Sequence, residues 1–193
     1  MDKYYHTKES VEEYIKLARD HDGNQNIIRL KEFLPAGSDL LEIGSGPGTD
    51  WKILSESYHV VGSDFSKEFL KHLQAYFPDG EFADLDASTL DTDRTFDGIY
   101  SNKVLHHLED EALEASIKRQ FEILNPDGIV CHTFWRGEDS EIYNDLFVNY
   151  HTDAGIRTLF EDRFDPLLIR FYKEFEDGDS ILYIGEKKKG KPS

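Results

Sequence analysis

The chain of 193 residues contains one cysteine, one methionine and two tryptophans. A single cysteine, Cys131, cannot form an internal disulfide and excludes a metal site built from several cysteines, and we expect no metal. Cys131 lies in an apolar, strand-like stretch, so we expect a buried and unreactive thiol. The chain also has no apolar run as long as a membrane span, and residues 1–22 are polar. We therefore expect a cytoplasmic protein that does not associate with membranes.

Basic residues are scarce as well, with 22 Lys and Arg against 39 Asp and Glu, which gives a net charge of −17. An acidic surface repels phosphate backbones and has few counterions to release, so we expect no nucleic-acid partner. Positive charge gathers only in residues 187–193, which we interpret as a solvated basic tail. The apolar fraction of 38% and the aromatic fraction of 13% are typical of a globular protein. The length suits a single domain over residues 1–193.

Strand-like and helix-like segments alternate from about residue 38 onward, which predicts an α/β fold with a mostly parallel sheet and helices on both faces. The expected strands cover residues 40–43, 59–62, 81–85, 96–101 and 129–134. The expected helices cover residues 9–20, 25–34, 49–57, 66–77 and 113–124, and residues 139–163 hold two further helical patterns. Residues 167–175 and 180–185 flank a Glu-Asp-Gly-Asp turn, which predicts a terminal hairpin.

A glycine-rich turn is the most informative motif of the chain. The apolar run that ends at Ile43 leads into Gly44-Ser45-Gly46-Pro47-Gly48, and the next apolar run ends at Asp64. Glycines let the main chain approach a ligand without a Cβ in the way, and an acid beyond the next strand can accept hydrogen bonds from a ribose diol. The motif therefore predicts a nucleoside pocket at the carboxyl edge of a parallel sheet.

The glycine spacing separates two classes of nucleotide cofactor. A dinucleotide fingerprint, G-x-G-x-x-G, would need glycine where this chain has Thr49, and Pro47 lacks a backbone donor that a pyrophosphate would use. An NAD-dependent oxidoreductase is therefore disfavoured. The stretch from Glu42 to Gly48 instead resembles the first motif of the class I S-adenosylmethionine (SAM)-dependent methyltransferases, of the small-molecule, type 11/12-like kind.

This resemblance implies a Rossmann-like, doubly wound sheet of seven strands, mostly parallel, with an antiparallel last strand beside the sixth. It also implies SAM as cofactor and S-adenosylhomocysteine (SAH) as product. Asp64 would hold both ribose hydroxyls and Phe65 would pack against the adenine. The adenine amine would meet Asp86, with Asp84 as an open alternative. The full set of expected cofactor contacts is Glu42, Gly44, Ser45, Gly46, Asp64, Phe65, Asp86, Ala87, Ser101 and Asn102.

The segment after the fourth strand resembles the fourth motif of the same family, in which a serine or asparagine precedes a Leu-His-His-like sequence. The backbone at Ser101 and Asn102 would lie beside the methionine part of the cofactor. His106 is the candidate catalytic residue, because an imidazole titrates near neutral pH and can act as a general base. The alternative is that one of His106 and His107 packs while the other caps the acidic turn at residues 109–111.

Four residues at the expected edges of the pocket are candidates for binding the acceptor: Tyr5, Lys103, Trp135 and Arg136. The two cations and the aromatic side chains predict a small acceptor that is anionic or aromatic. The competing interpretation is that Arg136 pairs with its neighbours Glu138 or Asp139 at the surface. The identity of the acceptor, the accepting atom and the oligomeric state stay open at this stage.

These expectations divide the domain into an N-terminal helical lid (1–34), a cofactor-binding core (35–135) and a substrate side with helices and the terminal hairpin (136–193). The predicted activity is methyl transfer from SAM to a small molecule, mainly by positioning the reactants for in-line displacement. The alternative is a non-catalytic SAM-binding protein that acts through a protein partner.

Overall fold

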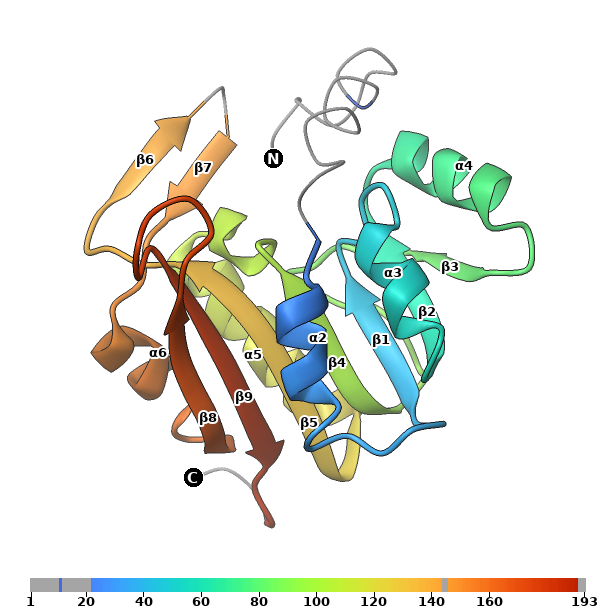
Figure 1. Cartoon of the computed structure of the whole chain (residues 1–193). Helices are drawn as coiled ribbons and strands as arrows, with labels where there is room; N and C mark the ends of the chain where they lie inside the picture. The colour runs from blue at the N-terminus through green and yellow to red at the C-terminus, as the bar shows by residue number, and fades with distance from the viewer. Residues whose placement is uncertain (1–10, 12–21, 144–145, 191–193) are drawn as a thin grey trace.

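A computed structural model describes residue 11, residues 22–143 and residues 146–190 of the chain (Figure 1). The described residues contain a seven-stranded sheet in the order β3-β2-β1-β4-β5-β9-β8. Its strands are β1 (Asp39–Ile43), β2 (His59–Asp64), β3 (Glu81–Asp84), β4 (Phe96–Asn102), β5 (Leu124–Trp135), β8 (Phe164–Tyr172) and β9 (Ser180–Lys187). Strands β1 to β5 pair in parallel, and β9 lies antiparallel between β5 and β8. The predicted mostly parallel sheet with an antiparallel last strand is confirmed.

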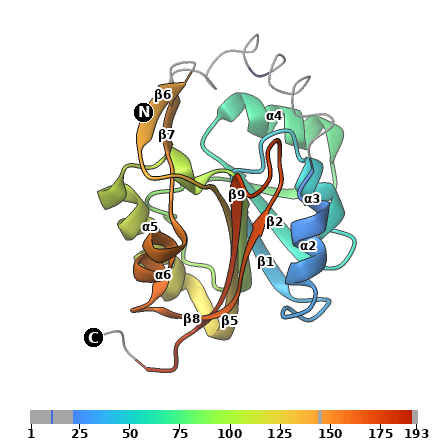
Figure 2. The same ribbon diagram turned by 60° about the vertical axis from the view of Figure 1, so that its left-hand side comes forward.

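Helices cover both faces of this sheet, as the alternating pattern predicts. Figure 2 shows α2 and α3 on one side of the strands and α5 and α6 on the other. The helices are α2 (Asn24–Leu30), α3 (Thr49–Leu54), α4 (Lys67–Tyr76), α5 (Asp110–Ile123) and α6 (Asp153–Phe160). Side-chain caps fix two of the helix starts: Ser66 accepts from Phe69 N at α4, and Thr152 accepts from Gly155 N at α6. Among the described residues, no helix is long and apolar enough to span a membrane.

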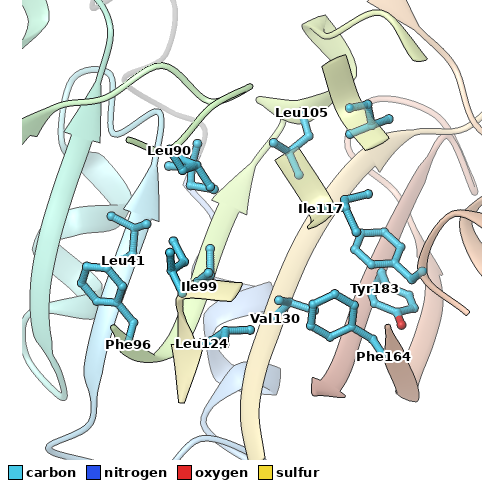
Figure 3. Packing of buried hydrophobic residues seen from close by; sticks show 14 of the residues in the cluster. Leu41, Leu90, Phe96, Ile99, Leu105, Ile117, Leu124, Val130, Phe164 and Tyr183 are labelled. Carbon is cyan, nitrogen blue, oxygen red and sulfur yellow. The ribbon is translucent and has the colours of Figure 1, made fainter. Parts of the chain in front are cut away.

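The sheet packs against its helices through two apolar clusters, one on each face. Successive residues of β1 alternate between them, since Leu40 packs toward α2 and α3 while Leu41 packs toward the face that α5 and α6 cover. Figure 3 shows the second cluster, in which Ile99 of β4 and Ile117 of α5 are fully buried. A buried Leu or Ile side chain contributes about 1.5–3 kcal/mol, so these contacts hold the strand ends rigidly in place.

The prediction of two helical patterns in residues 139–163 is wrong for the first of them. Strands β6 (Ser140–Tyr143) and β7 (Leu146–Asn149) form a separate two-stranded hairpin, and only the second pattern is a helix, α6. Ile142 pairs with Phe147, and the strands carry β-branched and aromatic residues. Over so few residues, apolar positions fit a helical spacing as well as a strand, so the sequence pattern is ambiguous.

The fold brings the carboxyl ends of the parallel strands β1, β2 and β4 to one edge of the sheet, as the glycine turn predicts. The helix expected at residues 9–20 lies outside the described residues apart from Val11, and so does Tyr5. Asp97, at the start of β4, has a structural role: its carboxylate accepts from Asp39 N and from the Asn125 side chain.

Candidate functional site

A cavity of about 390 Å³ lies at the carboxyl edge of the sheet, within the usual range for small-molecule sites. Three parts of the chain line it: the glycine turn, the loops after β2 and β3, and the segment after β4 together with Phe147 of β7. It brings together nine of the ten residues expected to contact a cofactor, namely Glu42, Gly44, Ser45, Gly46, Asp64, Phe65, Asp86, Ala87 and Asn102. The tenth, Ser101, is fully buried, and its Oγ lies 2.8 Å from His132 Nδ1.

The glycine turn needs glycine for both conformation and space. Gly44 and Gly46 have φ angles of +69° and +49°, in the region that residues with a Cβ rarely adopt. A Cβ on Gly44 would lie 2.6 Å from Val104 Cγ2, which belongs to the segment after β4. The turn is tied to the next strand by the Ser45 N–H, which donates to the Ser63 carbonyl at 2.8 Å. The main chain is thereby exposed to the cavity without side chains in between.

Asp64 at the end of β2 is only 6% exposed and is held by the backbone. Its Oδ2 accepts from Gly46 N at 3.0 Å and its Oδ1 accepts from Ser66 N at 2.8 Å. Burial raises the pKa of Asp64 to about 6, although these N–H groups oppose the shift. The carboxylate therefore stays largely ionised at neutral pH. The backbone N–H groups of Gly46, Phe65 and Ser66 bond to this carboxylate, which keeps lone-pair capacity to accept from a ligand hydroxyl.

Glu42 forms the floor of the cavity beneath the glycine turn. Its Oε2 accepts from Ser45 Oγ at 2.5 Å, and the residue is 3% exposed. Burial, together with the nearby carboxylates of Asp50 and Asp64, raises the pKa of Glu42 to about 8. At neutral pH this carboxyl is therefore mainly protonated, and a cation in the cavity would favour its ionised form.

Of the two competing acids after β3, Asp86 lines the cavity and Asp84 does not. The Asp86 Oδ1 accepts from the backbone N–H of Ser88 at 2.8 Å and from its hydroxyl at 2.5 Å. These bonds fix the loop that presents Ala87 to the cavity. Asp84 is exposed at the end of the strand, where it pairs in register with Asp64. The geometry thus favours Asp86 over the alternative.

Asp50, in the first turn of α3, lines the cavity but is not among the expected site residues. Its carboxylate accepts from Gly23 N at 2.6 Å, from the Tyr100 hydroxyl at 2.8 Å and from Asn102 Nδ2 at 3.0 Å. Burial raises its pKa. An acid two residues past a glycine turn gives no local signal, because its three donors come from segments 27 to 52 residues away.

The wall after β4 places His107, rather than His106, in the cavity. His106 is 2% exposed and packs against the ring of His107, with 4.0 Å between the ring centroids, and burial lowers the pKa of His106 well below its usual value. His107 Nδ1 donates to the Phe147 carbonyl at 2.7 Å, which ties the β6–β7 hairpin to this wall. The rest of the wall is Val104, Leu108, Glu109, Ala112 and Phe147.

Lys103 lines the cavity, yet its ammonium is directed to the terminal hairpin. The Nζ donates to Ser180 Oγ at 2.6 Å and to the Phe134 carbonyl at 3.2 Å, and it lies 3.2 Å from the ring centroid of Trp135. Burial lowers the pKa of Lys103 to about 7. These contacts hold a residue whose φ of +56° is unusual for a side chain of this size.

The other two described candidates for acceptor binding do not line the cavity. Trp135 stacks on Phe175, with 5.7 Å between the ring centroids. The Arg136 guanidinium lies 4.5 Å from the ring centroid of Phe171 and donates to the Gly178 carbonyl at 3.3 Å. In the described part of the chain, no group of three or more His, Cys, Asp or Glu side chains is arranged to hold a metal ion.

Comparison with known proteins gives a consistent picture. Residues 40–128 match a family model described as a methyltransferase domain. The chain is 33% identical over 94 residues to trans-aconitate 2-methyltransferase of Methylobacterium radiotolerans, which covers 47% of this chain and 35% of that protein. It is 30% identical over 112 residues to 2-methyl-6-phytyl-1,4-hydroquinone methyltransferase of Synechocystis, which covers 55% of this chain and 35% of that protein. The chain thus spans about a third of the length of these curated relatives.

Solved structures share the fold over most of the chain. The 1,6-didemethyltoxoflavin-N1-methyltransferase of Burkholderia thailandensis, crystallised with its substrate and SAH, superposes with a TM-score of 0.77 at 20% identity, covering 94% of this chain and 85% of that one. The N-methyltransferase NodS of Bradyrhizobium japonicum, crystallised with SAH, gives a TM-score of 0.70 at 18% identity, covering 86% of this chain and 87% of that one. At such identities the likeness concerns the fold.

Proposed function

We propose that the chain is a class I SAM-dependent methyltransferase, since residues 40–128 match a methyltransferase-domain model, and that it transfers a methyl group from SAM to a small-molecule acceptor. The observation that carries the proposal is the joining of the glycine turn to Asp64. Gly46 donates its N–H to the Asp64 carboxylate, and both line the same cavity. This is the arrangement that a nucleoside with a ribose diol requires.

SAM is the cofactor of this family and SAH is its product, and the donor set of the cavity fits SAM. Asp64 would hold the ribose hydroxyls, and Asp86 with Ala87 would meet the adenine. Asp64 carries a negative charge in the cavity, and a ligand with a sulfonium and an ammonium group would favour the ionised forms of Glu42 and Asp50 beside it. Gly44 and Gly46 leave room for the main chain to approach the methionine part.

When bound, the cofactor supplies a methyl group on a positively charged sulfur, which an electron-rich atom of the acceptor displaces in line. The protein has to position that atom and exclude water. Val104, Leu108 and Phe147 provide an apolar wall for this purpose. Because His107 lines the cavity and His106 is buried behind it, His107 is the better candidate to take a proton from the acceptor, at Nε2, since Nδ1 donates to Phe147.

We propose an aromatic or otherwise planar acceptor over an anionic one. The apolar wall with Phe147 supports the first, whereas the charged groups of Lys103 and Arg136 are engaged at the terminal hairpin. The names of the two curated relatives include both kinds of acceptor, a carboxylated one (trans-aconitate) and an aromatic one (a hydroquinone). Acceptor screening should therefore pair hydroxylated aromatic compounds with carboxylates of similar size.

The decisive experiment is calorimetric titration of the protein with SAM, SAH and NAD in parallel. We expect SAM and SAH to bind and Asp64→Ala to weaken both by roughly 100-fold, because two hydrogen bonds to a charged group are lost. Asp84→Ala is the matched control, since this exposed acid pairs in register with Asp64 but lies outside the cavity. Binding of NAD alone would overturn the proposal. SAM-dependent release of SAH in the acceptor screen would separate an enzyme from a non-catalytic binding protein.

A further inference from the structure

A continuous chain of hydrogen bonds runs from the segment before α2 to the cavity wall after β4. It begins at the Gly23 N–H, which donates to Asp50 Oδ1 at 2.6 Å. Asp50 Oδ2 accepts from Asn102 Nδ2 at 3.0 Å. The Asn102 Oδ1 in turn accepts from Thr133 Oγ1 at 2.6 Å, and that hydroxyl accepts from the Lys103 N–H at 2.9 Å. Four segments that are far apart in the sequence are joined in this way.

The Gly23 end of this chain has no room for a side chain. A Cβ on Gly23 would overlap the Tyr100 hydroxyl and lie 2.5 Å from Asp50 Oδ2. The φ angle of Gly23 is −81°, which any residue can adopt, so the glycine serves close approach and not conformation. Tyr100 is fully buried and donates its hydroxyl to the same carboxylate. Gly23, which directly precedes α2, therefore lies against Asp50 itself.

The other end of the hydrogen-bond chain fixes the positions of two residues that line the cavity, Asn102 and Lys103. Both polar atoms of the Asn102 amide are used, one toward Asp50 and the other toward Thr133, so its side chain has one orientation. The bond from the Lys103 N–H to Thr133 holds Lys103 in its left-handed conformation. Asp50, Asn102 and Lys103 line the cavity, whereas Gly23 and Thr133 do not.

We propose that Asp50 is a positioning residue that couples the docking of the segment at Gly23 to the binding of the cofactor, through Asn102 and Thr133. This inference rests on the proposed function, since it takes SAM or SAH as the ligand. Coupling between two sites is reciprocal. If the Gly23 bond stabilises the arrangement of Asn102 and Lys103 that binds the ligand, the ligand must stabilise the Gly23 bond by the same factor.

The first test displaces Gly23 from Asp50 by steric overlap, at a residue that does not itself line the cavity. Gly23→Ala is expected to weaken SAH binding in calorimetry by about tenfold, because the added Cβ displaces the Gly23 N–H and leaves the Asp50 carboxylate one donor short. Gly155→Ala is the control, because Gly155 lies within α6 and a Cβ there meets only Thr152 Oγ1, at 3.3 Å. This control is expected to bind SAH as the unmodified protein does.

The second test acts at Thr133 and separates positioning from a general loss of stability. Thr133→Val removes the hydroxyl at nearly constant volume and is expected to weaken SAH binding, and Thr133→Ser is expected to restore it. Hydrogen exchange at the Gly23 amide, followed by NMR, is the second readout. SAH should slow this exchange about tenfold in the unmodified protein and in Thr133→Ser, and not in Thr133→Val.

The outcomes of these tests distinguish a failure of the coupling from a failure of the proposed function. Weakened binding in Gly23→Ala and Thr133→Val, with rescue by Thr133→Ser, supports the coupling. Equal SAH affinity in all variants, or slowing of Gly23 exchange that persists in Thr133→Val, overturns it and leaves the proposed function standing. A lower melting temperature without a change in SAH affinity would assign the hydrogen-bond chain a purely structural role. This result would also overturn the coupling. No binding of SAM or SAH by the unmodified protein would overturn both.

Discussion

The two sides of the cavity are built in different ways. On the cofactor side, the bonded pairs lie within one strand-turn-helix-strand unit: Ser45 bonds to Glu42 over 3 residues of sequence, and Gly46 bonds to Asp64 over 18. On the acceptor side, His107 is held by Phe147, which is 40 residues away. Lys103 is held by Ser180, which is 77 residues away.

This difference explains which residues are recognisable in advance. A local unit has the same residue spacing wherever it occurs, so its ligand contacts can be inferred from the pattern alone. A wall made of distant segments depends on how loops of variable length pack, which no local pattern describes. We therefore expect changes on the cofactor side to act on stability and cofactor affinity together. At the contact between His107 and the β6–β7 hairpin, we expect them to act on local mobility.

The largest effect is expected where the two sides touch, at Gly44. Gly44→Ala places a Cβ at positive φ and against Val104, so the free energy of unfolding should fall by about 3 kcal/mol, measured by chemical denaturation. Adding Val104→Ala should recover about 1 kcal/mol of this loss, because it removes the steric part. If Gly44→Ala were as stable as the unmodified protein, the close contact between the two sides would be disproved.

The next effect is a pH dependence that comes from the cofactor side. Because the pKa of Glu42 is raised from 4.5 to about 8 on folding, the folded state binds more protons than the unfolded state between these values. Its contribution to stability is therefore present at low pH and is lost as the pH rises through this window, by at most about 1.4 kcal/mol per pH unit.

Glu42→Gln should remove this contribution. The difference in unfolding free energy between the variant and the unmodified protein, measured in denaturant from pH 5 to pH 8, should change steadily in favour of the variant. Taking the difference cancels the opposite slope from His132, whose pKa burial lowers to about 3. A difference that does not vary with pH would show that Glu42 is ionised throughout.

A smaller effect is expected on the acceptor side, at the tie between His107 and the hairpin. His107→Leu removes the bond to Phe147, so hydrogen exchange of the β7 amides should accelerate about tenfold while SAH affinity stays unchanged. Adding Asn149→Ala removes the bond from Asn149 to Asp110 and should accelerate exchange of the β7 amides further. His59→Leu, on the exposed start of β2, serves as the control. A loss of SAH affinity in His107→Leu would contradict the separation of the two sides.

The smallest effect is expected at Arg136, which lies away from the cavity. Arg136→Ala removes a cation–π contact with Phe171 at the surface, so the unfolding free energy should change by less than about 1 kcal/mol. SAH affinity should not change, and rates with carboxylated and uncharged acceptors should fall equally or not at all. A selective loss with carboxylated acceptors would restore the interpretation of Arg136 as an acceptor-binding residue.

Sequence patterns predicted the fold class and most strands within two or three residues, because buried parallel strands are short apolar runs between clear turns, and the family resemblance implied the seven-stranded sheet. They failed at residues 140–149, where a hairpin replaces a predicted helix. Ten residues of mixed polarity fit the spacing of a helix as well as the alternation of a strand. That error concealed Phe147 as a lining residue. Asp50 was also missed, because its partners at Gly23, Tyr100 and Asn102 meet it only after the chain has folded.

The amino-acid sequence by itself determined the class of cofactor site, because glycine spacing and the acid after β2 act through local backbone geometry that needs no distant partner. Tertiary structure decided which of Asp84 and Asp86, and which of His106 and His107, line the cavity. It also turned the Lys103 ammonium toward Ser180. These outcomes depend on contacts between distant segments: β3 pairs with β2, His107 bonds to β7, and Lys103 bonds to β5 and β9.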